Sequence, residues 1–130
     1  GIPKKYFIKG DPYHCHCAKT KRLIEEKIKK IIPNVELSFQ SRFGPQEWLK
    51  PYMNEKFEEL IKKNKKKICV IAPGFVSDCL ETLEEIRIQG KEDFLKHGGT
   101  HFSYIPCLND QAGSTQMFNK LINQELIGWI

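Results

Sequence analysis

Apolar and polar residues follow two different periods along the chain, one typical of strands and the other of helices. The clearest strand is predicted over 67–72, because a short β-branched and apolar run is bounded there by lysines and a Pro-Gly pair. Strands are also predicted over 35–40 and 101–106, and the weak alternation over 4–9 indicates the exit from an earlier element. The strand-like segments are therefore short and well separated.

Helical periodicity fills the stretches between these strands. The first helix is predicted to have Asp11 as its N-cap and Pro12 at the first helical position, and to end before Pro33. The second is predicted to begin at Asn54, again as an N-cap. This second helix is expected over 54–63. The later helices are expected over 78–89, in a short stretch before 98, and over 114–128.

The alternation of strands and helices predicts an α/β fold. Successive strand-helix units favour a three-layer sandwich, in which a mainly parallel, Rossmann-like sheet carries helices on both faces through right-handed crossovers. No internal repeat or low-complexity linker interrupts the pattern, so residues 1–130 are expected to form a single domain. Ligands of such sheets bind at the carboxyl ends of the strands, which directs attention to the loops 40–51, 73–78 and 106–112.

Charge and hydropathy limit the partners and the cellular location that can be expected. The chain has 21 Lys and Arg against 16 Asp and Glu, a net charge of +5. Many of the lysines lie in runs at 27–30 and 62–67, which fit solvated helix faces, with an anionic membrane surface as the alternative. We expect no nucleic-acid partner and at most peripheral membrane contact. No apolar run approaches the roughly 20 residues of a membrane span, and a cytoplasmic protein is expected.

The five cysteines form no recognisable disulfide or metal-binding pattern. Their number is odd and no two are spaced as Cys-x-x-Cys, which argues against a disulfide framework and against a closed zinc or iron–sulfur site. The run Tyr-His-Cys-His-Cys at 13–17 holds four potential ligands, but residues two apart on a helix point to different sides. Surface histidines and a core-facing Cys17 are expected there, with a metal role alongside a partner segment as the alternative.

Three polar residues after the best strand are candidates for metal binding. Glu81, Glu85 and Gln89 stand at i, i+4 and i+8 and share one face of the predicted helix. Such a carboxylate pair can hold a divalent cation loosely, through one or two oxygens and water, which suits a site that also releases its metal. Asp78-x-x-Glu81 is also a capping box, and the pattern alone favours that role. Glu84 is expected to face solvent.

Residues of the 40–51 loop are candidates for ligand binding. Trp48 lies in a Gly-Pro-containing loop at a predicted strand end, where its indole can stack on an aromatic ligand or anchor the loop. Ser41 and Arg42, at the mouth of the same strand, can bind a carboxylate or cap loop carbonyls. The sequence contains no GxGxxG, P-loop, GxSxG or HExxH motif.

Four blocks of sequence, in order along the chain, together resemble protoporphyrin ferrochelatase, and bacterial forms most of all. They are Gly-Asp-Pro-Tyr at 10–13, Leu-Ser-Phe-Gln-Ser-Arg-Phe-Gly-Pro at 37–45 with Trp-Leu-Lys-Pro at 48–51, Pro-Gly-Phe-Val-Ser-Asp-Cys-Leu-Glu-Thr-Leu-Glu-Glu-Ile at 73–86, and Tyr-Ile-Pro-Cys-Leu-Asn at 104–109. The resemblance implies a chelatase-type C-terminal half. It also implies a lyase of haem biosynthesis, which inserts ferrous iron into protoporphyrin IX to form protohaem.

The resemblance assigns roles to the candidate residues. Glu81 matches the family's catalytic glutamate, which is also a candidate metal ligand. Glu85 matches the next member of an acidic series that leads metal to or from the site. Gln89 stands where many members have an acid, so that it is a weak metal ligand. Trp48 matches the pocket tryptophan near the macrocycle.

The remaining implications concern the pocket wall and cofactors. Ser41 looks like a polar group on that wall, near a propionate. Cys79 occupies a position that is His in some members, and its role as a ligand stays open. Ferrous iron is implied as a substrate, with no tightly bound cofactor. No [2Fe–2S] cluster is expected, because the chain has no cysteine-bearing extension of the kind that holds it in some members.

The resemblance also implies that part of the enzyme lies outside this chain. The family's catalytic His belongs to a His-Gly-Leu-Pro or His-Gly-Ile-Pro segment, and this chain opens at Gly1-Ile2-Pro3. The N-terminal half, which forms the other wall of the pocket, is then an expected partner, together with protoporphyrin IX and ferrous iron. We expect the 130-residue chain to be inactive alone. A non-catalytic porphyrin-binding module is the alternative function.

Overall fold

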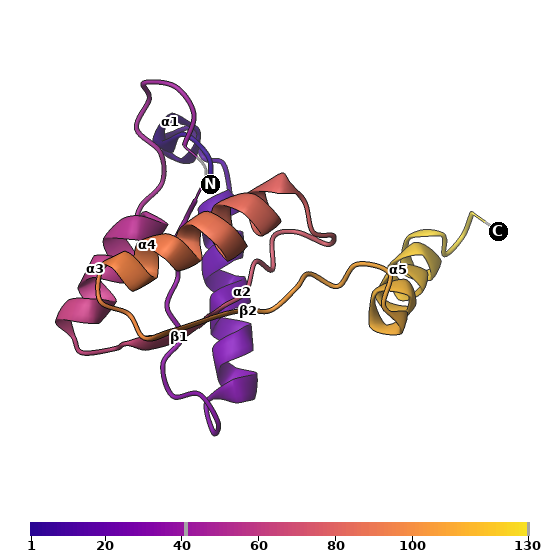
Figure 1. Ribbon diagram of the computed structural model, residues 1–130. Helices are drawn as coiled ribbons and strands as arrows, with labels where there is room; N and C mark the ends of the chain where they lie inside the picture. Colours follow the sequence, from indigo (N-terminus) through magenta and orange to yellow (C-terminus); the bar gives the residue numbers. More distant parts are fainter. Residues whose placement is uncertain (41, 130) are drawn as a thin grey trace.

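The computed structural model describes residues 1–40 and 42–129 and has an α/β arrangement (Figure 1). Its elements, in chain order, are α1 (Lys4–Ile8), α2 (Tyr13–Ile28), α3 (Met53–Lys62), β1 (Lys67–Val70), η1 (Glu81–Gly90), α4 (Lys91–Lys96), β2 (His101–Tyr104) and α5 (Ala112–Glu125). The α/β class predicted from the sequence is confirmed.

The sheet consists of β1 and β2, which pair in parallel. Lys67 lies opposite His101 and Val70 lies opposite Tyr104. The connection between the strands passes through η1 and α4, as a parallel pair requires. Within residues 1–40 and 42–129 no further strand joins these two, so the larger sheet of the expected three-layer sandwich is not confirmed.

Two segments predicted as strands or strand exits have a different structure. Residues 35–38 belong to no strand, and Phe39 forms a single parallel bridge with Tyr52. The Phe39 amide donates to the Pro51 carbonyl at 2.8 Å, so a loop rather than a sheet takes up this hydrogen bond. The alternating segment near the N-terminus forms the short helix α1. Alternation predicts a strand only where a neighbouring strand can satisfy the backbone groups.

The core is built from aromatic and aliphatic side chains of α3, η1, α4 and β2. Phe57, Ile86, Phe94 and Phe102 are all at least nine-tenths buried, and Phe94 is fully buried. The three phenylalanine rings are in mutual contact, with centroids 5.4 to 6.1 Å apart. Gly99 passes so close to the Phe94 ring that a Cβ atom there would collide with it. These contacts hold α3, η1 and α4 against one face of β2.

Both predicted helix starts are displaced by one residue. The Asp11 Oδ1 atom accepts a hydrogen bond from the Tyr13 amide at 2.9 Å, but α2 begins at Tyr13 with Pro12 in the N-cap position, one residue later than predicted. The helix predicted to begin at Asn54 begins at Met53 instead, after extended Tyr52, and no side chain caps it. Asn54 therefore lies in the first turn.

The helices α2 and α5 lie outside this core. No residue of α2 is buried in the described structure, and Ser114 is the one buried residue of α5. Figure 1 shows α5 set apart from the remaining elements, at the end of the segment that follows β2. Across the described residues, no helix is both long enough and apolar enough to cross a membrane.

Candidate functional site

A cleft of about 580 Å³ lies between the segment 39–54 and the helix η1. One wall consists of the ends of the 39–52 loop and the start of α3, and the other consists of η1 and the start of α4. The lining residues are Phe39, Gln40, Arg42, Tyr52, Met53, Asn54, Leu80, Glu84, Glu85, Gln89, Gly90 and Asp93. The cleft thus pairs aromatic and apolar groups with several carboxylates.

The two walls are joined by the side chain of Gln40. Its amide nitrogen donates to the carbonyl of Glu81 at 2.9 Å, which fixes the first residue of η1 relative to the loop. The Gly1 amino group donates to the carbonyl of Gln40 at 3.3 Å. The N-terminal end of the chain therefore lies at the same end of the cleft as Glu81.

The helix η1 is a π-helix, in which hydrogen bonds join residues five apart. Helices of this kind are rare and occur often at functional sites. The spacing brings Gln89 to Glu84, so that the Gln89 amide donates to the Glu84 Oε1 atom at 3.2 Å. Glu84 is half-buried and lines the cleft, which corrects the prediction that it faces solvent.

The three residues of the predicted series do not lie together in one metal centre. Glu85 and Gln89 line the cleft, whereas the half-buried Glu81 is not among the lining residues. A hydrogen bond from the Cys79 thiol, and a second from its own backbone amide, hold the pKa of Glu81 below its usual value. Across residues 1–40 and 42–129, no three His, Cys, Asp or Glu side chains form a cluster that could hold a metal ion.

The predicted capping box at Asp78 is wrong. The Asp78 amide donates to the Asn109 Oδ1 atom at 2.8 Å, not to Glu81, so one half of the box is missing. No side-chain hydrogen bond caps η1. The Asp78 carboxylate instead receives hydrogen bonds from four groups that are distant in the sequence or one turn away: the Tyr104 hydroxyl at 2.7 Å, the Asn109 amide at 2.8 Å, the Thr82 hydroxyl at 3.0 Å and the Cys107 amide at 3.4 Å.

These hydrogen bonds set the protonation states around Asp78. Donation by Asn109 and by Tyr104 holds the pKa of Asp78 well below its usual range, so its carboxylate is charged at neutral pH. Burial raises the pKa of Tyr104, and its hydrogen bonds to Cys107 and Asp78 raise it further. Burial also raises the pKa of the Cys107 thiol. The group therefore contains one carboxylate surrounded by protonated donors.

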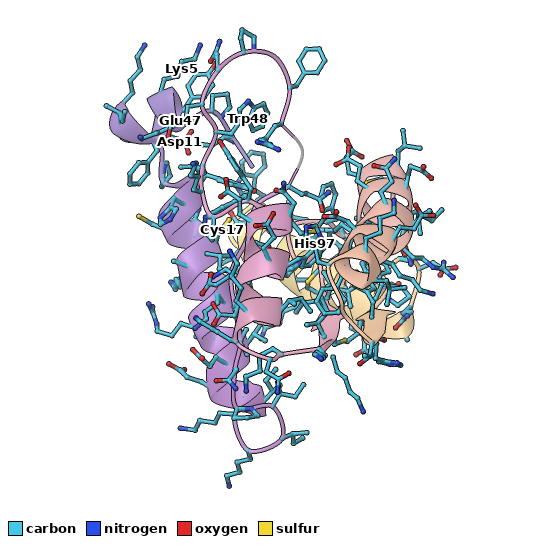
Figure 2. The ribbon with its side chains drawn as sticks, turned by 60° about the vertical axis from the view of Figure 1, so that its left-hand side comes forward. Lys5, Asp11, Cys17, Glu47, Trp48 and His97 are labelled. Carbon is cyan, nitrogen blue, oxygen red and sulfur yellow. The ribbon has the colours of Figure 1, made fainter. Side chains whose placement is uncertain are left out.

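Trp48 lies in the loop that faces the N-terminal segment. Figure 2 shows it beside Glu47, at the end of the molecule that also carries Lys5 and Asp11. The indole nitrogen donates to the carbonyl of Phe43 at 3.1 Å, and the Leu49 amide donates to the carbonyl of Ile2 at 3.0 Å. These contacts fit the interpretation of Trp48 as a loop anchor. Its half-buried side chain retains some exposed surface.

The other candidates of this loop are placed differently. Ser41 lies outside the described residues. The Arg42 guanidinium sits 4.2 Å from the centre of the Tyr52 ring and lines the cleft. In the 13–17 run, His14 is half-buried between the rings of Phe7 and Phe39, so it is not the surface histidine that the sequence predicts. Phe39, which helps to bury His14, lies 25 residues away in the sequence, so no local pattern could have predicted this contact.

Several residues of the site were not singled out from the sequence. Tyr52 and Asp93 line the cleft, and Tyr104 and Asn109 bind Asp78. The only available signal was position, because Tyr104 lies in the predicted strand 101–106 and Asn109 follows that strand in a loop at the carboxyl end of the sheet.

Comparison with known proteins agrees with the blocks of sequence noted above. Residues 1–126 match the family model described as Ferrochelatase. The chain is 57% identical over 128 residues to the ferrochelatase of Francisella tularensis subsp. novicida (strain U112), and 56% identical to those of F. tularensis subsp. tularensis (strain SCHU S4 / Schu 4) and subsp. holarctica (strain LVS). Each match covers 97% of this chain and 38% of the relative. The chain belongs to the ferrochelatase family.

Proposed function

We propose that the full-length protein is a cytoplasmic ferrochelatase, which inserts ferrous iron into protoporphyrin IX to form protohaem in haem biosynthesis. The observation that carries this proposal is the cleft along η1, in a chain 57% identical to a ferrochelatase. One wall offers carboxylates for a divalent cation, and the other offers aromatic and apolar groups for a macrocycle. Both are needed by an enzyme that brings iron and porphyrin together.

Glu81 is the proposed catalytic residue. Its lowered pKa favours the charged carboxylate at neutral pH, and a carboxylate can accept a pyrrole proton or bind ferrous iron. Glu85 continues the route for the metal along the cleft, and Gln89 contributes a weaker amide oxygen. Because residues 1–40 and 42–129 form no cluster of three acidic, His or Cys ligands, iron would be held loosely and would pass on to the porphyrin.

Trp48 and Ser41 are the proposed porphyrin-binding residues of this chain. The half-buried indole of Trp48 is held by its hydrogen bond to Phe43, which leaves its ring in a fixed orientation for stacking. Ser41 adjoins the cleft residues Gln40 and Arg42 in the sequence, and it is proposed to bind a propionate. Cys79 bonds to Glu81 through its thiol, which favours an indirect role over direct metal ligation.

The rest of the pocket is proposed to come from a part of the enzyme outside this chain, because the chain spans 38% of the length of the relatives it matches. Residues 35–38 belong to no strand of the described chain, and Gly1 lies against Gln40. We propose that a strand preceding Gly1 pairs here and extends β1 and β2 into the sheet of a three-layer sandwich. The family's catalytic His, at its end, would then enter the cleft beside Gln40.

The test is anaerobic metallation of protoporphyrin IX by ferrous iron, followed by absorbance. It compares the 130-residue chain, the same chain combined with the N-terminal half of the enzyme, and that pair carrying Glu81→Ala. Activity is expected only from the combined halves, and Glu81→Ala should lower the rate by about 10²–10⁴-fold, as the loss of a positioned acid–base group commonly does. Glu92→Ala is the matched control, because exposed Glu92 on α4 does not line the cleft.

The outcomes separate the proposed enzyme from its alternative. An unchanged rate in Glu81→Ala would overturn the assignment of the catalytic residue. A folded pair that binds porphyrin through Trp48 but never metallates it would overturn the enzymatic function in favour of a porphyrin-binding module.

A further inference from the structure

Two loops at the carboxyl ends of the strands are joined by a reciprocal pair of hydrogen bonds. The Asp78 amide donates to the Asn109 Oδ1 atom at 2.8 Å, and the Asn109 Nδ2 atom donates to the Asp78 Oδ2 atom at 2.8 Å. Asp78 follows β1 and Asn109 follows β2. A single side chain therefore closes the loop before η1 onto the loop before α5.

Asn109 makes two further hydrogen bonds in the same region. Its Nδ2 atom also donates to the Cys107 carbonyl at 3.1 Å, and its backbone amide donates to the Val76 carbonyl at 2.9 Å. Asn109 adopts the left-handed conformation with a φ of 50°. Asparagine tolerates this region better than most residues, and the conformation aims the side chain back at Asp78. The position combines an uncommon backbone with a fully engaged side chain.

A chain of contacts leads from this pair to Glu81. The Asp78 Oδ1 atom accepts from the hydroxyl of Thr82 at 3.0 Å, and this hydroxyl accepts from the Cys79 amide at 2.9 Å. Thr82 is the second residue of η1, and its side chain is fully buried and held in place by its surroundings. The Thr82 amide also donates to the Cys79 carbonyl at 3.1 Å. Glu81 directly precedes Thr82, so the hydrogen bonds that tie Thr82 and Cys79 to Asp78 also restrain the backbone at Glu81.

We infer that Asn109 is a positioning residue, which fixes the Glu81 carboxylate by clamping Asp78 at the start of η1. The inference rests on the proposed function insofar as Glu81 is catalytic, and it adds a residue that touches neither iron nor porphyrin. Without the Asn109 side chain, the Asp78 amide and one carboxylate oxygen lose their partners, and residues 78–81 can shift. A displacement of about 1 Å at a catalytic group commonly costs about 10²-fold in rate.

The first experiment measures hydrogen exchange in the full-length protein, because exchange does not depend on turnover. Asn109→Ala is expected to speed exchange of the amides in 78–83 at least tenfold, while amides of the core segment 91–96 keep their wild-type rates. Asn64→Ala is the matched control, since Asn64 also has a positive φ, of 58°, but no side-chain hydrogen bond within the described chain. The control should leave 78–83 unchanged.

The second experiment measures metallation kinetics against pH with Asn109→Asp, which has nearly the shape of asparagine. Above neutral pH two carboxylates would face one another at the clamp, and kcat should fall about 10–100-fold with little change in KM. As the pH falls towards about 5, the pair should take up one shared proton and restore the hydrogen bond, so the ratio of variant to wild-type kcat should rise. Tyr104 and Cys107, which also face Asp78, stay protonated over this range because burial raises the pKa of each.

Unchanged exchange over 78–83 in Asn109→Ala, or a kcat ratio of Asn109→Asp that does not depend on pH, would overturn the inference. If Asn109→Ala fails to fold, the pH-reversible Asn109→Asp variant decides the matter. If the wild-type enzyme metallates no porphyrin, the proposed function fails. Exchange over 78–83 then still tests the clamp by itself.

Discussion

The segment 53–104 and the helices that flank it differ in how completely they are packed. The central segment contains α3, β1, η1, α4 and β2, and all four residues of the buried hydrophobic cluster belong to it. By contrast, α2 has no buried residue in the described structure, and the apolar residues of α5 are largely exposed. Phe118 is 43% exposed and Leu121 is 48% exposed.

The same difference divides the two faces of β1. Ile68 and Val70 pack against the central cluster, whereas Cys69 is exposed and Ile71 is 41% exposed. The sequence from Ile68 to Ala72 is apolar throughout, as in a strand covered on both sides, but the described residues cover only one side. The comparison teaches that the central segment is locally complete, while the flanking helices and the open face of the sheet carry apolar surface suited to further burial.

The largest expected effect is at the centre of the cluster. Phe94→Ala should lower the free energy of unfolding by about 3–5 kcal/mol, because it removes a fully buried ring that contacts two others. Phe118→Ala in α5 is the matched control and should change it by less than about 0.5 kcal/mol. Urea denaturation followed by circular dichroism measures both. Equal losses would show that α5 is packed as firmly as the centre.

A smaller effect is expected from a pair of glycine substitutions. Gly99→Ala should destabilise the chain by about 1–3 kcal/mol, because its Cβ would collide with the Phe94 ring. Gly113→Ala in α5 should be neutral or slightly stabilising, since no atom lies within 4 Å of the added Cβ and alanine favours the helix. Thermal melts of both variants check the difference. A destabilised Gly113→Ala would contradict the open packing of α5.

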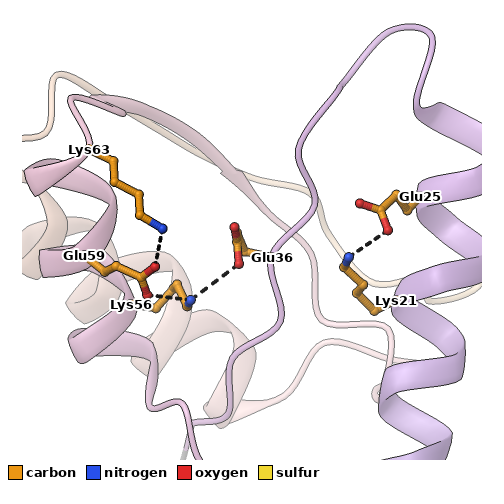
Figure 3. A network of polar contacts seen from close by, with 6 residues as sticks. All are labelled: Lys21, Glu25, Glu36, Lys56, Glu59 and Lys63. Atoms are coloured by element: carbon orange, nitrogen blue, oxygen red, sulfur yellow. Dashed lines mark hydrogen bonds and ion pairs between the residues drawn. The ribbon is translucent and has the colours of Figure 1, made fainter.

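The smallest effect is expected at the surface of the central segment, in the ion pairs drawn in Figure 3. Glu59 lies 2.6 Å from both Lys56 and Lys63, and their hydrogen bonds lower the pKa of Glu59 from its ordinary 4.5 to about 2. Because the folded pKa is the lower one, this stabilisation is present above about pH 4.5 and is lost as the pH falls towards 2.

Glu59→Gln should therefore be slightly less stable than the wild type at pH 7 and equal to it near pH 2. Added salt should shrink the difference at pH 7, since the pair is exposed to solvent. Denaturation at the two pH values, with and without 1 M salt, measures this. A difference that persists at pH 2 would point to packing rather than charge.

Local patterns in the sequence determined a large part of the fold. The apolar run at 67–72 predicted β1, and Asp11-Pro12 predicted the start of α2 to within one residue, because strands of this kind and N-caps depend on residues close together in the chain. The order of helices and strands from Tyr13 onwards was also predicted, apart from the segment 35–40. That segment forms only the bridge between Phe39 and Tyr52, since no strand of the described residues lies beside it.

The candidate site was predicted in part. The sequence singled out Glu81, Glu85 and Gln89, and two of these line the cleft. It could not reveal that η1 is a π-helix, because such helices are rare and the periodicity was compared with that of the common α-helix. The π-helix brings Glu84 to Gln89 and into the cleft, where an α-helical reading had left it in solvent.

Only the tertiary structure decided the role of Asp78. From the sequence it was a helix cap, since Glu81 stands three residues later. In the folded chain its partners Tyr104 and Asn109 are 26 and 31 residues away, and they outcompete the local bonds by meeting the carboxylate with well-placed donors. The sequence by itself thus determined the family, the helices from Tyr13 onwards and the two strands with local signals. The hydrogen bonds that join distant loops were settled by folding, because it alone brings β1 and β2 side by side.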